Sequence, residues 1–340
     1  MARVITFGEI MMRLNPEGYR RIVQADRFEA SFAGGEANVA VSLAQYGNDV
    51  SFVSKVPAHE LGQACINSLR RYGVGVEHIV RAGDRLGIYF VEKGASQRAS
   101  KVIYDRSHSA IALAKRDDFD WDKIFEGVNW FHFTGITPAL GGELPAICLD
   151  ACIAARKHNV TVSCDLNYRK KLWSREAAKE TMEKLIGYAD VCIANEEDAS
   201  DVFGIRAADT DIESGQLSKE GYISVAKQIC DTYGCKKCAI TLRTSISATI
   251  NKWAGMLYNG DEAHFSKEYT INIVDRVGGG DSFGGALIHS LLQNKDPQDA
   301  IEYAVAASCL KHTIEQDFNL VTEDEVTALC KGSGSGRVQR

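Results

Sequence analysis

The segment Asp275-Arg-Val-Gly-Gly-Gly-Asp-Ser-Phe-Gly-Gly285 is the most informative stretch of this chain for both fold and chemistry. Its three consecutive glycines allow a sharp turn and let backbone N–H groups approach a ligand closely. Behind them, Phe283, Leu287 and Leu291 have the spacing of an apolar helix stripe. A helix beginning here directs free N–H donors and a positive dipole end at the turn. The segment therefore predicts an anion hole suited to phosphate oxygens.

Asp281 lies at the edge of this predicted anion hole, where a carboxylate can accept the proton of an attacking hydroxyl. The segment is not a phosphate loop of the Gly-Lys-Ser/Thr type, because no such sequence follows the glycines. Nor does it fit the dinucleotide fingerprint, which requires glycine where Phe283 stands. Because glycine-rich helix starts also occur for packing reasons, the segment alone leaves a phosphate site and a packing role open.

Strand-like and helix-like segments alternate along most of the chain, which predicts a mainly parallel sheet with helices on both faces. The expected helices include 36–47 and 61–72. The expected core strands are 4–9, 50–53, 130–134, 161–166, 191–194 and 239–242.

Two extended stretches, near 12–31 and 86–108, interrupt this alternation. We interpret them as a small β-lid that covers a site, although an ordinary surface hairpin fits the pattern equally. We thus expect one domain over residues 1–330, followed by a flexible Gly-Ser tail at 331–340.

Composition narrows the class of protein. The chain has 340 residues, of which 45% are hydrophobic and 25% charged, with a formal net charge of -6. Its Lys and Arg residues are scattered, which argues against a nucleic-acid partner. The N-terminus lacks the pattern of a signal peptide, and no apolar run has the length of a membrane span. Most of the ten cysteines lie in apolar segments, so we expect reduced thiols and a cytoplasmic enzyme without a membrane partner.

The glycine-rich segment resembles the C-terminal signature of the ribokinase-like (PfkB) carbohydrate kinases, which usually reads Asp-Thr-x-Gly-Ala-Gly-Asp. Gly34-Gly-Glu-Ala-Asn-Val-Ala-Val-Ser-Leu-Ala-Gln-Tyr-Gly47 resembles their N-terminal signature. The two stand about 240 residues apart in the family's order, and the resemblance covers essentially the whole chain. It implies a three-layer α/β/α fold with a small β-lid, and transfer of the γ-phosphoryl group of ATP, with Mg²⁺, to a sugar hydroxyl.

The resemblance also implies roles for individual residues. Asp281 is expected to be the catalytic base. The glycine turn is expected to form the anion hole, at Gly278, Gly279 and Gly280, with Gly279 also contacting the nucleotide. Residues of the N-terminal signature are expected to contact sugar hydroxyls, namely Gly34, Gly35 and Asn38. An unperturbed Asp has a pKa of about 3.9 and is a weak base. In a loose phosphoryl-transfer transition state, however, the proton leaves late and positioning does most of the work.

Two segments depart from the family pattern. Asn195-Glu-Glu-Asp198 stands where the family commonly has Asn-x-x-Glu, a motif linked to Mg²⁺ and phosphate. Asn195 is therefore expected near the nucleotide, and the shorter Asp198 near the metal, directly or through a water molecule. Arg243-Thr-Ser-Ile-Ser-Ala248 stands where relatives often read Lys-x-Gly-x-x-Gly near the nucleotide. Arg243 can bind a phosphate bidentately or form a salt bridge at a strand end.

Four residues bear on the acceptor, namely Tyr89, Tyr104, Arg106 and Arg169. Their arrangement is similar to that in the 2-keto-3-deoxygluconate kinases of the family, where equivalent tyrosines and arginines surround the acid. A guanidinium fork fits a carboxylate, and a tyrosine offers an apolar face with a hydroxyl. The alternatives are arginines paired with nearby acids and tyrosines packed on a partner subunit.

We therefore expect a kinase acting on 2-keto-3-deoxygluconate. A fructokinase or another neutral-sugar kinase is the first alternative, and a non-catalytic sugar sensor that kept the fold is the second. The intact Asp281 argues against the sensor, which has no need of a base. Because an exposed lid strand needs covering, we also expect a homo-oligomer formed through the lid.

Overall fold

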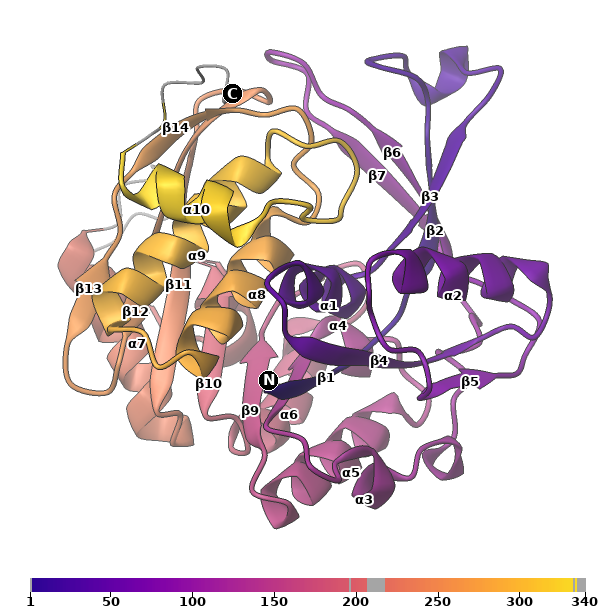
Figure 1. Ribbon diagram of the computed structural model, residues 1–340, viewed down its shortest axis with the longest axis horizontal. Helices are drawn as coiled ribbons and strands as arrows, with labels where there is room; N and C mark the ends of the chain where they lie inside the picture. Colours follow the sequence, from indigo (N-terminus) through magenta and orange to yellow (C-terminus); the bar gives the residue numbers. More distant parts are fainter. Residues whose placement is uncertain (1, 196, 207–217, 333, 335–340) are drawn as a thin grey trace.

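A ten-stranded sheet forms the centre of the molecule (Figure 1). The computed structural model describes residues 2–195, 197–206, 218–332 and 334, so most of the expected tail at 331–340 lies outside the described residues. The strand order is β13-β12-β11-β10-β9-β8-β1-β4-β5, with β14 beside β12. The strands are β1 (Arg3–Phe7), β4 (Asp49–Val56), β5 (Ile79–Arg81), β8 (Trp130–Thr134), β9 (Thr161–Asp165), β10 (Val191–Asn195), β11 (Lys237–Ser245), β12 (Ile250–Tyr258), β13 (Ala263–Phe265) and β14 (Tyr269–Asn272).

Pairing is parallel from β5 to β11, and the edge formed by β12, β13 and β14 is antiparallel. The sheet separates two hydrophobic clusters, and the adjacent β1 residues Val4 and Ile5 belong to opposite ones. Side chains of α1, α2, α8, α9 and α10 pack in the first cluster, and side chains of α3, α5, α6 and α7 in the second. The expected three-layer α/β fold with a mainly parallel sheet is thus confirmed, and the antiparallel edge was not foreseen.

The α-helices are α1 (Gly35–Gln45), α2 (Glu60–Arg71), α3 (Trp121–Ile124), α4 (Ile136–Ala139), α5 (Leu144–Lys157), α6 (Arg175–Ile186), α7 (Lys219–Tyr233), α8 (Gly279–Leu292), α9 (Pro297–Lys311) and α10 (Glu323–Cys330). Short η1 (Ile22–Gln24), η2 (Arg116–Asp118) and η3 (Ala199–Phe203) complete the described helical elements. The sequence placed α1 and α2 within two residues of their observed ends. Apolar residues at helical spacing and a glycine of positive φ after α1, Gly47, account for this agreement.

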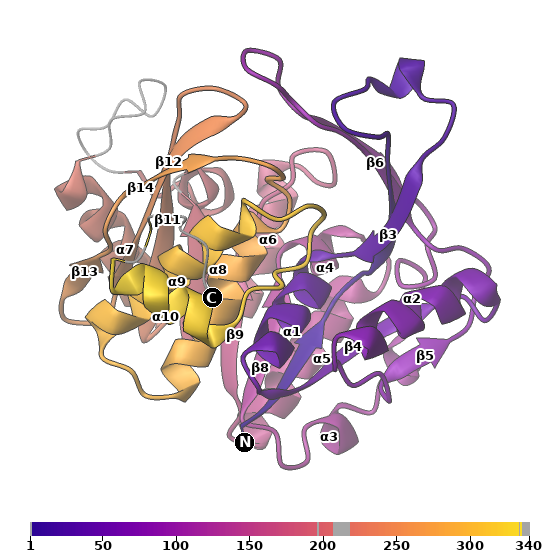
Figure 2. The ribbon, with the colours of Figure 1, turned by 45° about the horizontal axis from the view of Figure 1, so that its top comes forward.

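A second, four-stranded sheet rises from the main body beside α1 and α2 (Figures 1 and 2). Its order is β3-β2-β6-β7, formed by Glu29–Ala33, Met11–Asn15, Ile88–Glu92 and Lys101–Asp105. The stretch 12–31 is extended only near its ends, because its middle turns through η1. The turn between β2 and β3 includes Gly18, which takes a positive φ of 59°.

Arg13 connects this small sheet to the main body through ion pairs with two aspartates. Its side chain is fully buried at the centre of β2. Nη2 donates to Asp275 Oδ2 at 2.6 Å, and Nη1 donates to Asp317 Oδ1 at 2.6 Å. Tyr89, opposite Arg13 on β6, donates its hydroxyl to Asp317 Oδ2 at 2.8 Å. Two strands of the small sheet are therefore tied to the segment that precedes the glycine turn and to the loop after α9.

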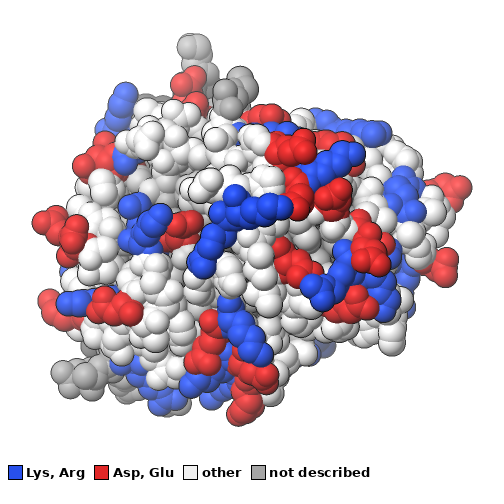
Figure 3. Space-filling model, turned by 90° about the horizontal axis from the view of Figure 1, so that it is seen from below, with Lys and Arg blue, Asp and Glu red and all other residues white. Residues whose placement is uncertain are grey.

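On the face of the molecule seen in Figure 3, Lys and Arg residues are interspersed with Asp and Glu residues, and no large patch of one charge is visible. All ten cysteines are free thiols, and most of them are buried. Cys235 and Cys238 are among the buried ones, and the described residues contain no metal-binding cluster around them. In the part of the chain that the structure describes, no helix is long and apolar enough to cross a membrane.

Replacement of Arg13 by Met is expected to lower the free energy of unfolding by about 3–5 kcal/mol, because two buried carboxylates lose their partner. Urea titration measures this change. Arg27→Ala is the matched control, since Arg27 pairs with Glu17 in the exposed connection between β2 and β3, and a loss below about 1 kcal/mol is expected there. Equal effects of the two substitutions would contradict the role of Arg13.

Candidate active site

The two glycine-rich signatures meet where α1 crosses α8. A Cβ on Gly285 would lie 2.7 Å from Ser42 Cβ, so the helices approach this closely only with glycine there. The crossing brings Asn38 to Asp281, and Asn38 Nδ2 donates to Asp281 Oδ2 at 2.6 Å. The other carboxylate oxygen, Oδ1, faces Gly35, whose Cβ position lies 3.7 Å away. Asp281 is thus held by one oxygen while the other faces the glycine turn before α1.

The three glycines before Asp281 differ in what a side chain at each position would meet. Gly278 has φ +82° and caps α8, and a Cβ there would lie 2.1 Å from the carbonyl oxygen of Asp317. A Cβ on Gly279 would lie 2.5 Å from the ring of His312. At Gly280, which is exposed, no described atom lies within 4 Å of the Cβ position. The first two glycines permit packing, and the third leaves open space before the free N–H groups of α8.

Burial raises the pKa of Asp281 to about 6, against the hydrogen bond from Asn38 and the nearby charge of Arg169, which both lower it. A second buried acid, Glu36, lies in the first turn of α1 and was missed by the sequence analysis. Its Oε1 accepts from Thr134 Oγ1 at 2.8 Å and from Thr137 Oγ1 at 2.6 Å. Burial raises its pKa to about 7. Its position inside the N-terminal signature was the available signal.

Carboxylates gather at the carboxyl ends of β9 and β10. Burial, followed by the charges of Asp198 and Asp281, raises the pKa of Asp165 well above its usual range. The charge of Arg169 lowers the pKa of all three carboxylates. Arg169 is exposed, and the described residues provide no hydrogen bond or ion pair to its side chain. It therefore lies near Asp281, with a guanidinium open to a ligand.

Asn195 and Asp198 form a closed turn after β10. Asn195 Oδ1 accepts from the N–H groups of Glu197 and Asp198 at 2.8 and 3.0 Å. The Asp198 carboxylate accepts from the N–H groups of Asn195 and Tyr168 at 3.2 and 3.0 Å. Burial raises the pKa of Asp198 to about 6. The described residues contain no group of three or more acid, His or Cys side chains placed to hold a metal ion.

Two arginines lie near each other before the glycine turn. Arg243 is exposed near the end of β11, and its charge, after burial, lowers the pKa of Arg276. Arg276 Nη2 donates to the carbonyl of Ala248 at 3.3 Å, while its Nε is buried without a hydrogen-bond partner. A role for Arg276 was not predicted from the sequence, although the presence of Arg at the usual Thr position of the signature was a signal. Neighbouring cations of this kind favour an anionic ligand.

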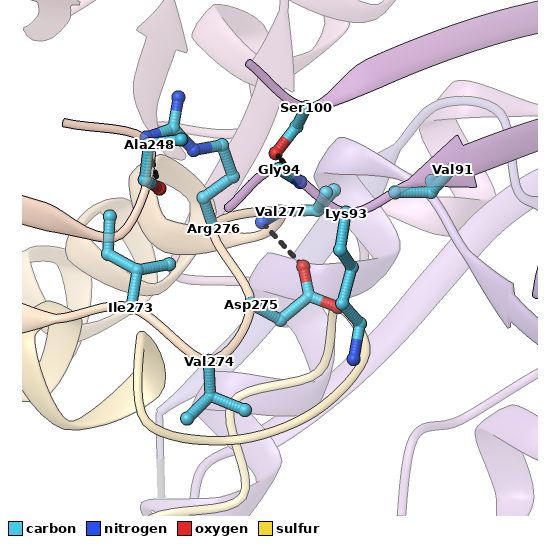
Figure 4. A pocket seen from close by; sticks show the side chains of 10 residues that line it. All are labelled: Val91, Lys93, Gly94, Ser100, Ala248, Ile273, Val274, Asp275, Arg276 and Val277. Carbon is cyan, nitrogen blue, oxygen red and sulfur yellow. Dashed lines mark hydrogen bonds between the residues drawn. The ribbon is translucent and has the colours of Figure 1, made fainter. Parts of the chain in front are cut away.

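A small pocket beside Arg276 lies between the end of β6 with the segment after it and the segment after β14 (Figure 4). One wall comes from the segment after β6, with Lys93, Gly94 and Ser100, and the other from residues 273–277. The carbonyl of Ser96 accepts from the N–H of Ala248 at 2.7 Å. The connection between β6 and β7 thus contacts both segments that are expected near the nucleotide.

Tyr89, Tyr104 and Arg106 lie together on and beside the small sheet. The rings of Tyr89 and Tyr104 stack at 6.0 Å, and the Arg106 guanidinium lies 5.4 Å from the Tyr104 ring. Arg106 also pairs with the buried Glu9, whose Oε2 accepts from Arg106 Nε at 2.7 Å. The carbonyl oxygen of Glu9 lies 1.9 Å from the position of a Cβ on Gly34. Glu9 thus links Arg106 to the glycine turn. A role for Glu9 was not predicted from the sequence.

An acid beside a helix N-terminus, with neighbouring arginines unpaired by carboxylates, is compatible with phosphoryl transfer. The chain belongs to the pfkB family of carbohydrate kinases, whose family model matches residues 1–317. A solved structure of 2-dehydro-3-deoxygluconokinase from Thermotoga maritima is 52% identical, with a TM-score of 0.94, and the match covers 97% of this chain and 98% of that one.

Two further sugar-acid kinases are similar to this chain over most of its length. A 2-dehydro-3-deoxygalactonokinase from Haloferax volcanii is 32% identical over 98% of each chain. A 2-dehydro-3-deoxygluconokinase from Bacillus subtilis is 27% identical over 90% of this chain and 88% of the relative. The expected family is thereby confirmed.

The acid limb of the kcat/KM–pH profile is expected to have its midpoint near the Asp281 pKa of about 6, because the base must be ionised. Asn38→Ala removes a hydrogen bond that favours the ionised form, so the limb should move to higher pH. Steady-state kinetics from pH 4.5 to 9 tests both statements. Asn48→Ala is the control, because the Asn48 amide contacts Leu43 and His289 instead. A limb that Asn38→Ala leaves in place would contradict this assignment.

Proposed function

We propose that this chain is an ATP- and Mg²⁺-dependent kinase that transfers the γ-phosphoryl group to a hydroxyl of 2-keto-3-deoxygluconate. The observation that carries the proposal is the placement of Asp281 between the glycine turn before α1 and the N-terminus of α8. The names of the similar proteins support a 2-keto-3-deoxy sugar acid as the acceptor.

In the proposed reaction, the acceptor hydroxyl lies against Asp281 Oδ1, because Oδ2 is held by Asn38. The carboxylate takes the hydroxyl proton as the new O–P bond forms and the bond to the ADP leaving group breaks. Free N–H groups at the start of α8 stabilise the charge on the transferred phosphoryl group. A pKa raised to about 6 makes Asp281 a stronger base than an ordinary Asp while it stays mostly ionised at neutral pH.

Arg243 and Arg276 are the proposed ligands of the nucleotide phosphates, together with the backbone at Gly279. Asn195 and Asp198 would act near the metal ion. Because both oxygens of Asp198 already accept backbone N–H groups, Mg²⁺ would be held mainly by phosphates and water molecules, with Asp198 in contact through water.

Arg169 is the proposed ligand of the acceptor carboxylate. Its guanidinium is exposed near Asp281, whereas Arg106 is neutralised by Glu9. Tyr104 would offer its half-exposed ring to the carbon chain of the acceptor, and Gly34 and Gly35 would contact its hydroxyls. The Arg106–Glu9 pair also favours the second candidate, a neutral sugar such as fructose, because it leaves one cation fewer for an acid.

The proposal extends to assembly and location. Strand β7 is an edge of the small sheet, and 40% of the surface of its Ile103 is accessible. An exposed edge with apolar side chains suits pairing with a second copy of the chain, which would close the lid over the site. Ten free cysteines, most of them buried, support a reducing compartment such as the cytoplasm.

An ADP-release assay with ATP and Mg²⁺ tests the acceptor against 2-keto-3-deoxygluconate, 2-keto-3-deoxygalactonate, gluconate, fructose, ribose and adenosine. Turnover is expected with the keto-deoxy acids. Arg169→Ala should raise KM for these acids about 10–100-fold with a smaller effect on kcat, because a hydrogen bond to a charged group is lost. Lys170→Ala, at the neighbouring exposed position, is the control. Turnover with fructose alone would support the neutral-sugar kinase, and silence with every acceptor would refute the proposal.

Asp281→Asn is expected to lower kcat by about 10²–10⁴-fold, because the general base is lost. Binding of ATP, measured by calorimetry, should change little. The exposed Asp231 of α7 provides the control substitution, Asp231→Asn. Near-normal turnover of Asp281→Asn would remove Asp281 from the role of base.

A further inference from the structure

Lys311, the last residue of α9, is fully buried. Its Nζ donates to three backbone carbonyl oxygens, those of Gln316 at 2.5 Å, Asp275 at 3.4 Å and Ile314 at 3.4 Å. A lysine ammonium has three donors, so these carbonyls take all of them. Burial of an ammonium group is costly unless its surroundings are built for it, and here they consist of carbonyl oxygens.

The three carbonyls come from two segments that shape the anion hole. Asp275 precedes the glycine turn, and residues 314–316 follow α9. Gln316 has φ +65°, unusual for a residue with a side chain, and its N–H donates to Asp275 Oδ2 at 3.2 Å. The next residue, Asp317, packs its carbonyl against Gly278. The position of Lys311 Nζ is therefore linked through one loop to the residue that caps α8.

Lys311 also balances a buried set of charges. Arg13 and Lys311 are fully buried, and Asp275 and Asp317 are each 3% exposed. Burial lowers the pKa of Lys311, and the charge of Arg13 also lowers it, while the two carboxylates oppose this effect and favour the charged form. With two cations and two anions the set is neutral. Without the lysine charge it would carry one net negative charge beside Asp281 and the predicted phosphate site.

We infer that Lys311 is a tethered substitute for a bound monovalent cation and a positioning residue for the anion hole. Rings of backbone carbonyls are the ligands by which proteins hold K⁺. The ammonium group is a compact point charge that takes the same oxygen ligands. Lys311 thus fixes the 314–317 loop and the Asp275 segment permanently, and the enzyme needs no K⁺, Na⁺ or NH₄⁺ from solution.

We expect the wild-type protein to ignore added monovalent cations and Lys311→Ala to respond to them, because this variant removes the side chain and leaves the carbonyls in place. The full chain is assayed with ATP and Mg²⁺ in tetramethylammonium buffers, with KCl or NH₄Cl added at constant ionic strength. The activity readout rests on the proposed phosphoryl transfer. The melting temperature is measured in the same salts, and it needs no sugar acceptor.

Wild-type kcat and melting temperature should not respond to K⁺ or NH₄⁺. Lys311→Ala should lose about tenfold or more in kcat, with a smaller change in KM, because a charge with three hydrogen bonds is removed. NH₄⁺ or K⁺ should restore kcat and raise the melting temperature of this variant. Lys311→Met fills the space without a charge, so it should be impaired in kcat and unresponsive to either cation.

Lys267→Ala is the matched control, because Lys267 is exposed and donates to a single carbonyl, that of Cys330, at 2.9 Å. It should behave as the wild type does. Activation of the wild-type protein by K⁺ would overturn the inference, and so would a fully active Lys311→Met in cation-free buffer. A Lys311→Ala variant whose kcat and melting temperature both ignore the cations would reduce Lys311 to a packing role. Failure of every acceptor would refute the proposed function alone, since the melting temperatures still report the cation.

Discussion

The buried guanidinium of Arg13 is the contact on which the rest of the site depends. It joins the small sheet to Asp275 and Asp317, which lie 262 and 304 residues further along the chain. A buried ion pair is costly to form and costly to break, so it stabilises a structure only when every charge has its partner. Here the need to satisfy both carboxylates leaves little freedom in where the small sheet lies. The residues that carry the glycine turn are held by the same contact.

The chemical character of the site follows from packing as well. Glycines allow α1 and α8 to cross closely, and the crossing both partly buries Asp281 and supplies its Asn38 partner. Burial disfavours the charged carboxylate, the hydrogen bond and the nearby charge of Arg169 favour it, and the pKa that results is about 6. A wider crossing would weaken both effects together. The helix packing and the strength of the base are therefore one property of the fold.

Local patterns in the sequence predicted α1, α8 and all of the parallel strands except β5, because each of these depends on spacing within one segment. The family was predicted from two such segments in their order along the chain. Strand β8 has the predicted bounds, since all five of its residues are buried. The roles of Arg13, Lys311 and Asp317 could not be predicted, because a charged residue in a strand, at a helix end or in a loop is usually exposed. Their partners are identified only after distant segments have been placed in three dimensions. The residue-level roles at the site stay predictions.

The distribution of charge around Asp281 links substrate binding to catalysis. Arg169 is the cation that lowers the pKa of Asp165, Asp198 and Asp281 together. If Arg169 takes the carboxylate of the acceptor, as proposed, part of its charge is neutralised. Asp281 then loses a stabilising influence on its ionised form, and its pKa rises further. An acid acceptor would in this way strengthen the base that removes its own hydroxyl proton, whereas a neutral sugar bound in the same position would leave the base unchanged.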